Sequence, residues 1–339
     1  MQLTTLCYIE KDDKYLMLHR TKKKNDLSKD MWIGVGGHFE DEESPVECLV
    51  REVKEETGLT LTSYRLRGIV TFISDEAEGE YMFLYTADGF EGQIKNCDEG
   101  ELEFIEKDRI RGLYMWTGDE IFLRLIREDY PMFDLRLEYN GKKLSRAVLD
   151  GKEMELFDIL SDDYKETGIV RERTSVHETG AWHKTSHVWI YRKKNSGYDV
   201  LLQKRNEHKD SFPGYYDISS AGHIPAGEDY KESALRELKE ELGITAKPEE
   251  LQLIGVHNGM SNEEFYGKPF INNEHSMVYV YDGTELEPDD FKLQKEEVES
   301  VKWIDYEVGK KSLFNGEMKN CVYSEEWEML GRYFFGSSN

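Results

Sequence analysis

The fold is decided by the stretch GGHFEDEESPVECLVREVKEETGL, from Gly36 to Leu59, because a second copy of it lies further along the chain. The second copy, AGHIPAGEDYKESALRELKEELGI, runs from Ala221 to Ile244, at an offset of 185 residues. A strand-like run that ends in an arginine precedes each copy, YLMLHR at residues 15–20 and VLLQKR at residues 200–205. Solenoid repeats have periods of about 20 to 50 residues, so this longer offset indicates a duplicated domain.

The length agrees with two globular domains, which we expect at residues 1–150 and 151–339. A chain of 339 residues is more than twice a typical domain of about 150 residues. We place the boundary at Asp150 and Gly151, a turn signal that follows an expected final strand, LEYNGKKLSRAVL. The next segment, KEMELFDILSDDYKETG, is then either the leader of the second domain or a linker.

The composition limits the classes of partner that the protein can bind and indicates its cellular compartment. A net charge of −25 argues against binding to nucleic-acid polymers, which need clustered cations. The four cysteines are far apart and form no CxxC pair, which argues against a zinc ribbon or a disulfide framework. The opening residues, MQLTTLCYIEKDDKYLM, lack a signal-peptide pattern, and no run of 18 apolar residues occurs. We therefore expect a cytoplasmic protein without membrane contact; the sequence leaves a homodimer open.

Each copy carries the signals of one amphipathic helix. In the first copy Ser44 is the expected N-cap, Pro45 takes the first helical position, Glu47 completes a capping box and Gly58 follows the last turn. These signals predict a helix over residues 45–57, with a buried stripe of Val46, Leu49, Val50 and Val53. The second copy repeats the pattern with Asp229, Glu232, Ala234, Leu235, Leu238 and Leu242.

Three glutamates at i, i+3 and i+4 cluster on another face of each helix. They are Glu52, Glu55 and Glu56 in the first copy and Glu237, Glu240 and Glu241 in the second. Like charges at this spacing destabilise an isolated helix by about 0.2 to 0.5 kcal/mol, so the cluster needs a cation, solvent or a metal. Carboxylate oxygens suit Mg²⁺ or Mn²⁺. A solvated acidic face is the alternative in so acidic a chain, but the duplication favours a metal site.

The spacing of nine positions in each copy resembles the box of the Nudix family. The matching residues are Gly37, Glu43, Arg51, Glu52, Val53, Glu55, Glu56, Gly58 and Leu59, and then Gly222, Glu228, Arg236, Glu237, Leu238, Glu240, Glu241, Gly243 and Ile244. The resemblance implies an α/β fold of two tandem α/β/α sandwiches with mixed β-sheets. It also implies Mg²⁺-dependent hydrolysis of a nucleoside diphosphate linked to another moiety.

The resemblance further implies roles for these residues. The metal ligands would be Gly37, Glu52, Glu55 and Glu56, and Gly222, Glu237, Glu240 and Glu241. Arg51 would pair with Glu43, and Arg236 with Glu228, to orient the catalytic carboxylates. The general base would be a helix glutamate, or a loop carboxylate, for which the candidates are Glu99, Glu296 and Glu297. We expect Arg20 and Arg205 to contact phosphate; a plain surface charge is the alternative reading of each.

The first half resembles the MutT-like enzymes that hydrolyse oxidised purine nucleoside triphosphates such as 8-oxo-dGTP. The resemblance rests on WIGVGG at residues 32–37 and MWTGD at residues 115–119. It implies that Trp116 stacks on the base and that Asp119 reads its edge, whereas Gly118, Ile33 and His38 depart from that pattern. Packing of Trp116 in the core is the alternative.

The second half resembles the Nudix branch related to isopentenyl diphosphate isomerase. The segments that carry the resemblance are GAWHKTSHVWIY, LLQKRNEHKDSFPGYYDISSAGHIPAGED and NNEH. His183, His223 and Glu274 match positions where the isomerase holds its metal, but Ala221 replaces its catalytic cysteine and Asn272 one of its paired carboxylates. The resemblance therefore implies hydrolysis rather than isomerisation. Structural roles for His183 and His187 remain open.

Two other functions remain open at this point. One half could be a non-catalytic nucleotide-binding domain that regulates its neighbour, although both boxes are complete. The second half could act on an isoprenoid or nucleotide-sugar diphosphate, because side chains outside the box select the substrate.

Overall fold

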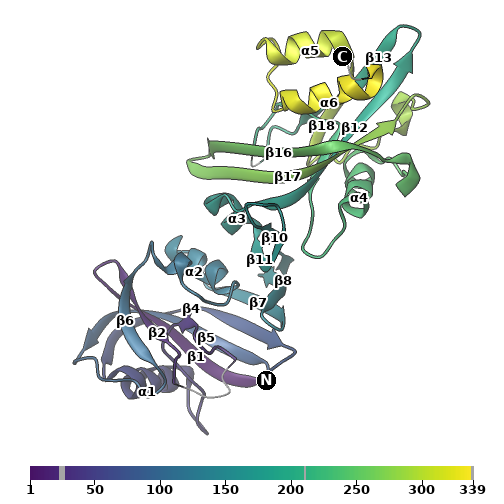
Figure 1. Cartoon of the computed structure of the whole chain (residues 1–339). Coiled ribbons are helices and arrows are strands. Elements are labelled where there is room, and N and C mark those ends of the chain that lie inside the picture. The colour runs from purple at the N-terminus through teal and green to yellow at the C-terminus, as the bar shows by residue number, and fades with distance from the viewer. Residues whose placement is uncertain (23–26, 210, 337–339) are drawn as a thin grey trace. The chain divides into compact units, whose positions relative to one another are not determined.

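The computed structural model in Figure 1 describes residues 1–22, 27–209 and 211–336 of the chain. The chain divides into two compact units. The first comprises Met1–Leu156 and Ile169–Ser175, and the second Phe157–Gly168 and Val176–Asn339. The limits expected from the sequence, 1–150 and 151–339, stay a prediction.

The first unit is built on one mixed sheet with the order β3-β2-β1-β5-β4-β7-β8-β9, and β6 also pairs with β2. Two pairs, β1 with β5 and β4 with β7, are parallel. The strands are β1 (Gln2–Lys11), β2 (Lys14–His19), β3 (Trp32–Ile33), β4 (Thr60–Ser74), β5 (Glu80–Glu91), β6 (Glu101–Glu106), β7 (Phe133–Asn140), β8 (Lys143–Leu149) and β9 (Lys152–Glu153). The helices are α1 (Pro45–Thr57), η1 (Ile110–Gly112) and α2 (Asp119–Arg127).

The sheet of the first unit is covered on both faces, and Figure 1 shows α1 and α2 on opposite sides of it. Side chains alternate between the two faces of a strand. In β1, Cys7 and Ile9 therefore pack in one core with Leu49 of α1, whereas Tyr8 contacts Phe122 of α2.

The second unit repeats this arrangement around β12. Its strands are β12 (His183–Lys194), β13 (Gly197–Arg205), β14 (Tyr216–Asp217), β15 (Ser220–His223), β16 (Gln252–Phe265), β17 (Lys268–Asp282) and β18 (Val298–Asp305). Its helices are α4 (Tyr230–Leu242), η2 (Pro248–Glu250), η3 (Pro288–Asp290), α5 (Tyr306–Phe314) and α6 (Ser324–Phe335). Val188 packs with Leu238 of α4, and Trp189, the next residue, packs with Trp327 of α6. The predicted α/β/α sandwiches with mixed sheets are confirmed.

The chain passes between the units along three further elements. These are β10 (Leu156–Leu160), β11 (Glu166–Glu172) and α3 (Arg173–Thr179).

Some local predictions need correction. The expected single strand LEYNGKKLSRAVL is a hairpin of β7 and β8, because Gly141 and Lys142 form a two-residue turn between Asn140 and Lys143. Asp150 and Gly151 form another turn, with φ of 48° and 78°, between β8 and β9. Val46 is 39% exposed rather than part of the buried stripe.

Within the described part of the chain, no helix has the length and apolar character needed to cross a membrane. The four cysteines are free thiols.

Candidate active sites

The local sequence places the first glutamate cluster on α1 with defined ends. The Ser44 side chain accepts from the Glu47 N–H, and the Glu47 carboxylate accepts from the Ser44 N–H, so the predicted capping box is present. Gly58 ends the helix in the left-handed conformation, with φ of 79°. In the second unit Asp229 caps α4 by accepting from the Lys231 and Glu232 N–H groups.

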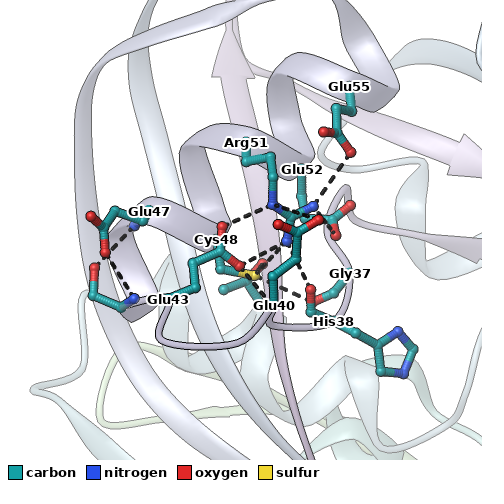
Figure 2. Close-up of polar contacts among 11 residues, drawn as sticks. Gly37, His38, Glu40, Glu43, Glu47, Cys48, Arg51, Glu52 and Glu55 are labelled. Atoms are coloured by element: carbon teal, nitrogen blue, oxygen red, sulfur yellow. Dashed lines mark hydrogen bonds and ion pairs between the residues drawn. The ribbon is translucent and has the colours of Figure 1, made fainter.

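Arg51 organises the carboxylates around α1 (Figure 2). Its guanidinium donates two hydrogen bonds of 2.8 Å to Glu43 and one of 2.8 Å to Glu52. A longer bond, 3.3 Å, reaches Glu55. The hydrogen bonds from Arg51 lower the pKa of Glu43 to about 2, so this carboxylate is ionised at neutral pH.

The same arrangement recurs on α4. Arg236 donates to Glu228 at 2.6 Å and to Glu237 at 3.1 Å, and its Nε lies 3.9 Å from Glu240. Ser233 also donates to Glu228, at 2.9 Å. The catalytic role of these pairs stays a prediction, but in each unit one arginine joins the box glutamates.

Each glycine loop lies directly against the first helix glutamate. A Cβ atom added to Gly37 would lie 2.5 Å from the carboxyl carbon of Glu52, and one added to Gly222 would lie 2.3 Å from that of Glu237. Neither position has room for a side chain unless the carboxylate moves. Each loop therefore holds its backbone beside a helix carboxylate.

The last glutamate of each cluster is buried, unlike the side chains of a solvated acidic face. Glu56 is 9% exposed and accepts from the Gly36 N–H at 3.0 Å. Glu241 is 7% exposed and accepts from the Ser220 hydroxyl at 2.7 Å. Burial and neighbouring carboxylates, Glu99 and Glu52 for Glu56 and Glu237 for Glu241, raise the pKa of each to about 8.

Glu99, the expected loop carboxylate, and Arg20, at the end of the strand-like run, lie at the glutamate cluster of α1. Arg20 Nη1 lies 3.2 Å from Glu99 Oε2, and both charges act on the Glu56 carboxyl. Because the carboxylates of Glu52, Glu56 and Glu99 lie close enough to act on one another, this oxygen donor set fits Mg²⁺ or Mn²⁺.

In the second unit, Glu297 rather than Glu296 takes the place of Glu99. The Glu297 carbonyl accepts from the Asn206 N–H just after Arg205, as the Glu99 carbonyl accepts from a backbone N–H just after Arg20. The Glu297 carboxylate pairs with Lys209, and Arg205 pairs with Asp217 at 3.0 Å.

The sequence missed Lys209, Asp217 and Ser220. Lys209 and Asp217 both act electrostatically on Glu241, and Ser220 donates to it. None of them belongs to the repeated motif, so only alignment of the two halves on their strands could have found them.

Trp116 and Asp119 lie in one aromatic cluster of the first unit. Trp116 is 6% exposed, donates to the Ser28 hydroxyl at 2.9 Å, and packs edge-on against Phe72 and Tyr139. Burial, with the charge of Glu120, raises the pKa of Asp119 well above its usual range.

The histidines and the glutamate suggested for the second half separate into two groups. His187 Nδ1 donates to Glu326 at 2.7 Å, and its Nε2 lies 3.9 Å from Glu274. His183 instead lies beside His223, with ring centres 5.2 Å apart.

The two units thus carry the same glutamate helix on the same α/β/α sandwich, and known proteins share these features. The NUDIX domain model matches residues 1–123 and 181–322. The chain belongs to the Nudix family. Nudix hydrolase 3 of Arabidopsis thaliana is 44% identical over 158 residues, which are 45% of this chain and 19% of that protein.

Other Nudix proteins are similar to one half of the chain. An uncharacterized Nudix hydrolase of Clostridium acetobutylicum is 36% identical over 173 residues, 51% of this chain and 80% of that protein. A mutator MutT protein structure from Bacillus halodurans is 28% identical, covering 45% of this chain and 99% of that chain, with a TM-score of 0.40. The match to the NUDIX domain model and the two Nudix hydrolase relatives support a hydrolase of the Nudix type.

Proposed function

We propose that each unit hydrolyses the diphosphate linkage of a nucleoside diphosphate derivative at its glutamate helix, with Mg²⁺ or Mn²⁺. The observation that carries this proposal is the duplicated site. In each unit one arginine orders the box glutamates, a glycine loop abuts the first of them, and the last is buried with a raised pKa. A solvated acidic face would not bury a carboxylate twice at the same position.

The chain's own residues would position the phosphates and move one proton. A bound divalent cation neutralises diphosphate charge and makes an attacking water more acidic. Arg20, which lies beside Glu99, supplies a cation for phosphate oxygens, and Arg205 does so in the second unit. Glu99 and Glu297 are the loop candidates for the general base; a helix glutamate is the other.

For the first unit we propose a nucleoside triphosphate as substrate, with 8-oxo-dGTP among those tested first. The rings of Phe72, Trp116 and Tyr139 lie 4.8–5.2 Å apart, and Asp119 acts on the Tyr139 hydroxyl. Burial and the charge of Glu120 raise the pKa of the Asp119 carboxyl, and we propose that this side chain forms a hydrogen bond at a purine edge.

For the second unit we propose hydrolysis of a diphosphate with a different, more polar moiety. Asp217 pairs with Gln203 in the sheet as Ile33 pairs with Leu18, so an aspartate stands where the first unit has isoleucine. The backbone also aligns Cys321 with Trp116. The Trp32 N–H donates to the Tyr114 carbonyl, and in the second unit the Tyr216 N–H donates to the Lys319 carbonyl. Trp116 and Cys321 each lie two residues after that carbonyl, so Cys321 takes the place of Trp116. The loss of the aromatic ring and the gain of a carboxylate favour a nucleotide sugar over an isoprenoid chain.

The test is a substrate panel on the full chain, with Mg²⁺ and with excess EDTA. It includes 8-oxo-dGTP, dGTP, dCTP, a nucleoside diphosphate sugar and isopentenyl diphosphate, and both phosphate and pyrophosphate are measured. The proposal expects Mg²⁺-dependent cleavage of a triphosphate and of the sugar derivative. Undiminished turnover in EDTA, or isomerisation of isopentenyl diphosphate, would contradict it.

A further inference from the structure

A cavity of about 60 Å³ lies in the first unit between β2, the end of β6, η1 and one face of α2. Its polar lining is made by Tyr15, Lys107, Arg111, Glu120, Arg124 and Arg127. A cavity needs about 10–15 Å³ to hold one water. This cavity therefore has room for several waters or for one tetrahedral oxyanion.

The cavity and the glutamate helix lie on opposite faces of the sheet. Tyr15 packs edge-on against Tyr8, which contacts Phe122 of α2. The next residue, Leu16, instead packs in the core beneath α1. In the sheet, β1 and β5 also separate β2 from β4, the strand that carries Phe72. The cavity is thus separate from both the glutamate cluster and the aromatic cluster of the proposed active site.

Cations dominate the polar lining, although the whole chain carries a net charge of −25. Four basic side chains line the cavity with one carboxylate, that of Glu120. Arg171, at 3.2 Å, and the Ser175 hydroxyl already contact this carboxylate. Walls with an excess of one charge sign concentrate counter-ions from solution. The cavity therefore favours an anion.

The basic side chains can bind an anion and keep their present carboxylate partners. The Lys107 ammonium donates to Glu10. The Arg124 guanidinium donates to Glu172 at 3.2 Å and lies 3.8 Å from Glu128. An ammonium has three N–H donors and a guanidinium five, so both groups have donors left for a ligand.

The Tyr15 hydroxyl adds a neutral donor to the cavity. Tyr15 is 4% exposed, and its hydroxyl forms no hydrogen bond with the residues that the structure describes. Burial, and then the charge of Glu10, raise the pKa of this hydroxyl, so it keeps its proton. Arg127 acts electrostatically on the same group. An anion in the cavity would give the buried hydroxyl an acceptor.

We propose that this cavity binds one phosphate group, through the Tyr15 hydroxyl and the side chains of Lys107, Arg111, Arg124 and Arg127. Guanidinium groups match pairs of phosphate oxygens, and an ammonium adds a point charge. A phosphate group offers more oxygens to these five side chains than a carboxylate does. The group comes either from free inorganic phosphate or from a nucleotide.

The bound phosphate would also stabilise the first unit. Arg111 belongs to η1 and Arg127 to the last turn of α2. One anion that contacts both side chains therefore connects the two elements. A ligand that binds only the folded chain raises its melting temperature.

The test measures anion binding by the full chain in excess EDTA, so that no metal holds an anion at the glutamate sites. Inorganic phosphate is titrated by calorimetry at constant ionic strength, with chloride as the reference anion, and melting curves are recorded with both. We expect one saturable phosphate site and a rise in melting temperature that chloride does not give. Absence of binding, or an equal effect of chloride, would overturn the proposal. No turnover is measured, so this failure would leave the proposed function untouched.

A nucleoside monophosphate, titrated in the same way, identifies the source of the group. Tighter binding than that of inorganic phosphate assigns the site to a nucleotide. Equal or weaker binding assigns it to free phosphate.

Variants then locate the site. Lys107→Gln and Arg127→Gln should each weaken phosphate binding about tenfold or more, because each removes a charge-assisted hydrogen bond. Tyr15→Phe keeps the ring and the fold and should also weaken binding. Arg146→Gln, on the exposed face of β8 in the same unit, and Glu56→Gln should bind phosphate as the native chain does. Native affinity in both Lys107→Gln and Arg127→Gln would refute the assignment.

Discussion

Glu56 and Glu241 each keep a proton at neutral pH when no metal is bound, because the pKa of each is about 8. A divalent cation must displace that proton. We therefore predict that Mg²⁺ affinity rises between about pH 6 and pH 9, with proton release on binding. Calorimetric titrations in two buffers of different ionisation enthalpy measure both quantities. The Glu56→Gln and Glu241→Gln double variant should lose this dependence, and a pH-independent affinity in the native chain would contradict the prediction.

A substitution at Trp116 can distinguish a packing role in the core from a role in recognising the base. If Trp116 stacks on a purine, Trp116→Ala should weaken substrate binding by about 1 to 3 kcal/mol. If it only fills the core, the change should destabilise the fold by about 3 to 5 kcal/mol and leave KM unchanged in the folded fraction. Steady-state kinetics and a melting curve on the same sample distinguish the two.

Asp119→Asn tests the hydrogen bond to the base. Asparagine keeps the size of the side chain but changes its hydrogen-bonding groups, so we expect the ratio of 8-oxo-dGTP to dGTP turnover to change while the fold is kept. Equal turnover of 8-oxo-dGTP, dGTP and dCTP by the native chain would end the purine proposal and leave the family assignment intact.

At individual residues the sequence predicted contacts better than burial. The resemblance to the Nudix box implied that Arg51 pairs with Glu43, and these two side chains form a bidentate pair. It could not reveal that Glu56 is buried, because the Gly36 N–H that donates a hydrogen bond to Glu56 lies 20 residues away in the sequence.

At the scale of elements, the glycine loops and helices form matched pairs. Gly37→Ala would push the Glu52 carboxylate aside, because an added Cβ lies 2.5 Å from it. We predict loss of hydrolysis in the first unit with little change in melting temperature, since only the end of a flexible side chain must move. Gly112→Ala, where an added Cβ meets nothing within 4 Å, is the control. A large drop in stability with normal kinetics would contradict this account of the loop.

A buried ion pair joins α6 to β12 and should make stability depend on pH. Burial disfavours a charged His187, but Glu326 outweighs it and raises the pKa of His187 from 6.5 to about 9. Because the folded-state pKa is the higher one, the stabilisation is complete below about pH 6.5 and is lost as the pH rises through about 9. His187→Gln should cost about 3 kcal/mol at pH 6, because Glu326 loses its buried partner, and less at pH 10.

Urea unfolding at the two pH values measures this difference. His275→Gln, a histidine of the same unit bonded to Asn258 rather than to a carboxylate, is the control. An equal loss at both pH values in His187→Gln would contradict the ion-pair explanation.

Helix ends were predictable from sequence because the capping signals are local. The predicted range 45–57 for α1 is confirmed. The β7–β8 hairpin was missed although Asn140-Gly141 is a strong turn signal, because the run was taken as one continuous strand. Exposure of Val46 was missed because the first turn of α1 extends beyond the edge of the core, which helical periodicity does not reveal.

At the scale of the whole molecule, the duplication was visible in sequence, whereas the difference between the copies was not. The boxes repeat position by position, so two folds of one type followed directly. The substitution of Asp217 and Cys321 for Ile33 and Trp116 emerges only when the strands of the two units are aligned. If the two units act on different substrates, as proposed, the difference depends on residues that the repeat does not contain.

In the proposed function the chain carries two independent glutamate-box active sites, and rate measurements on site variants test their independence. Hydrolysis of the substrate panel is measured with Mg²⁺ for the native chain, Glu56→Gln, Glu241→Gln and the double variant, with melting curves to confirm folding. We predict that each single variant loses one set of substrates and keeps the other, and that the double variant loses all turnover. Full activity in a folded double variant, or loss of every activity in one single variant, would contradict two independent sites.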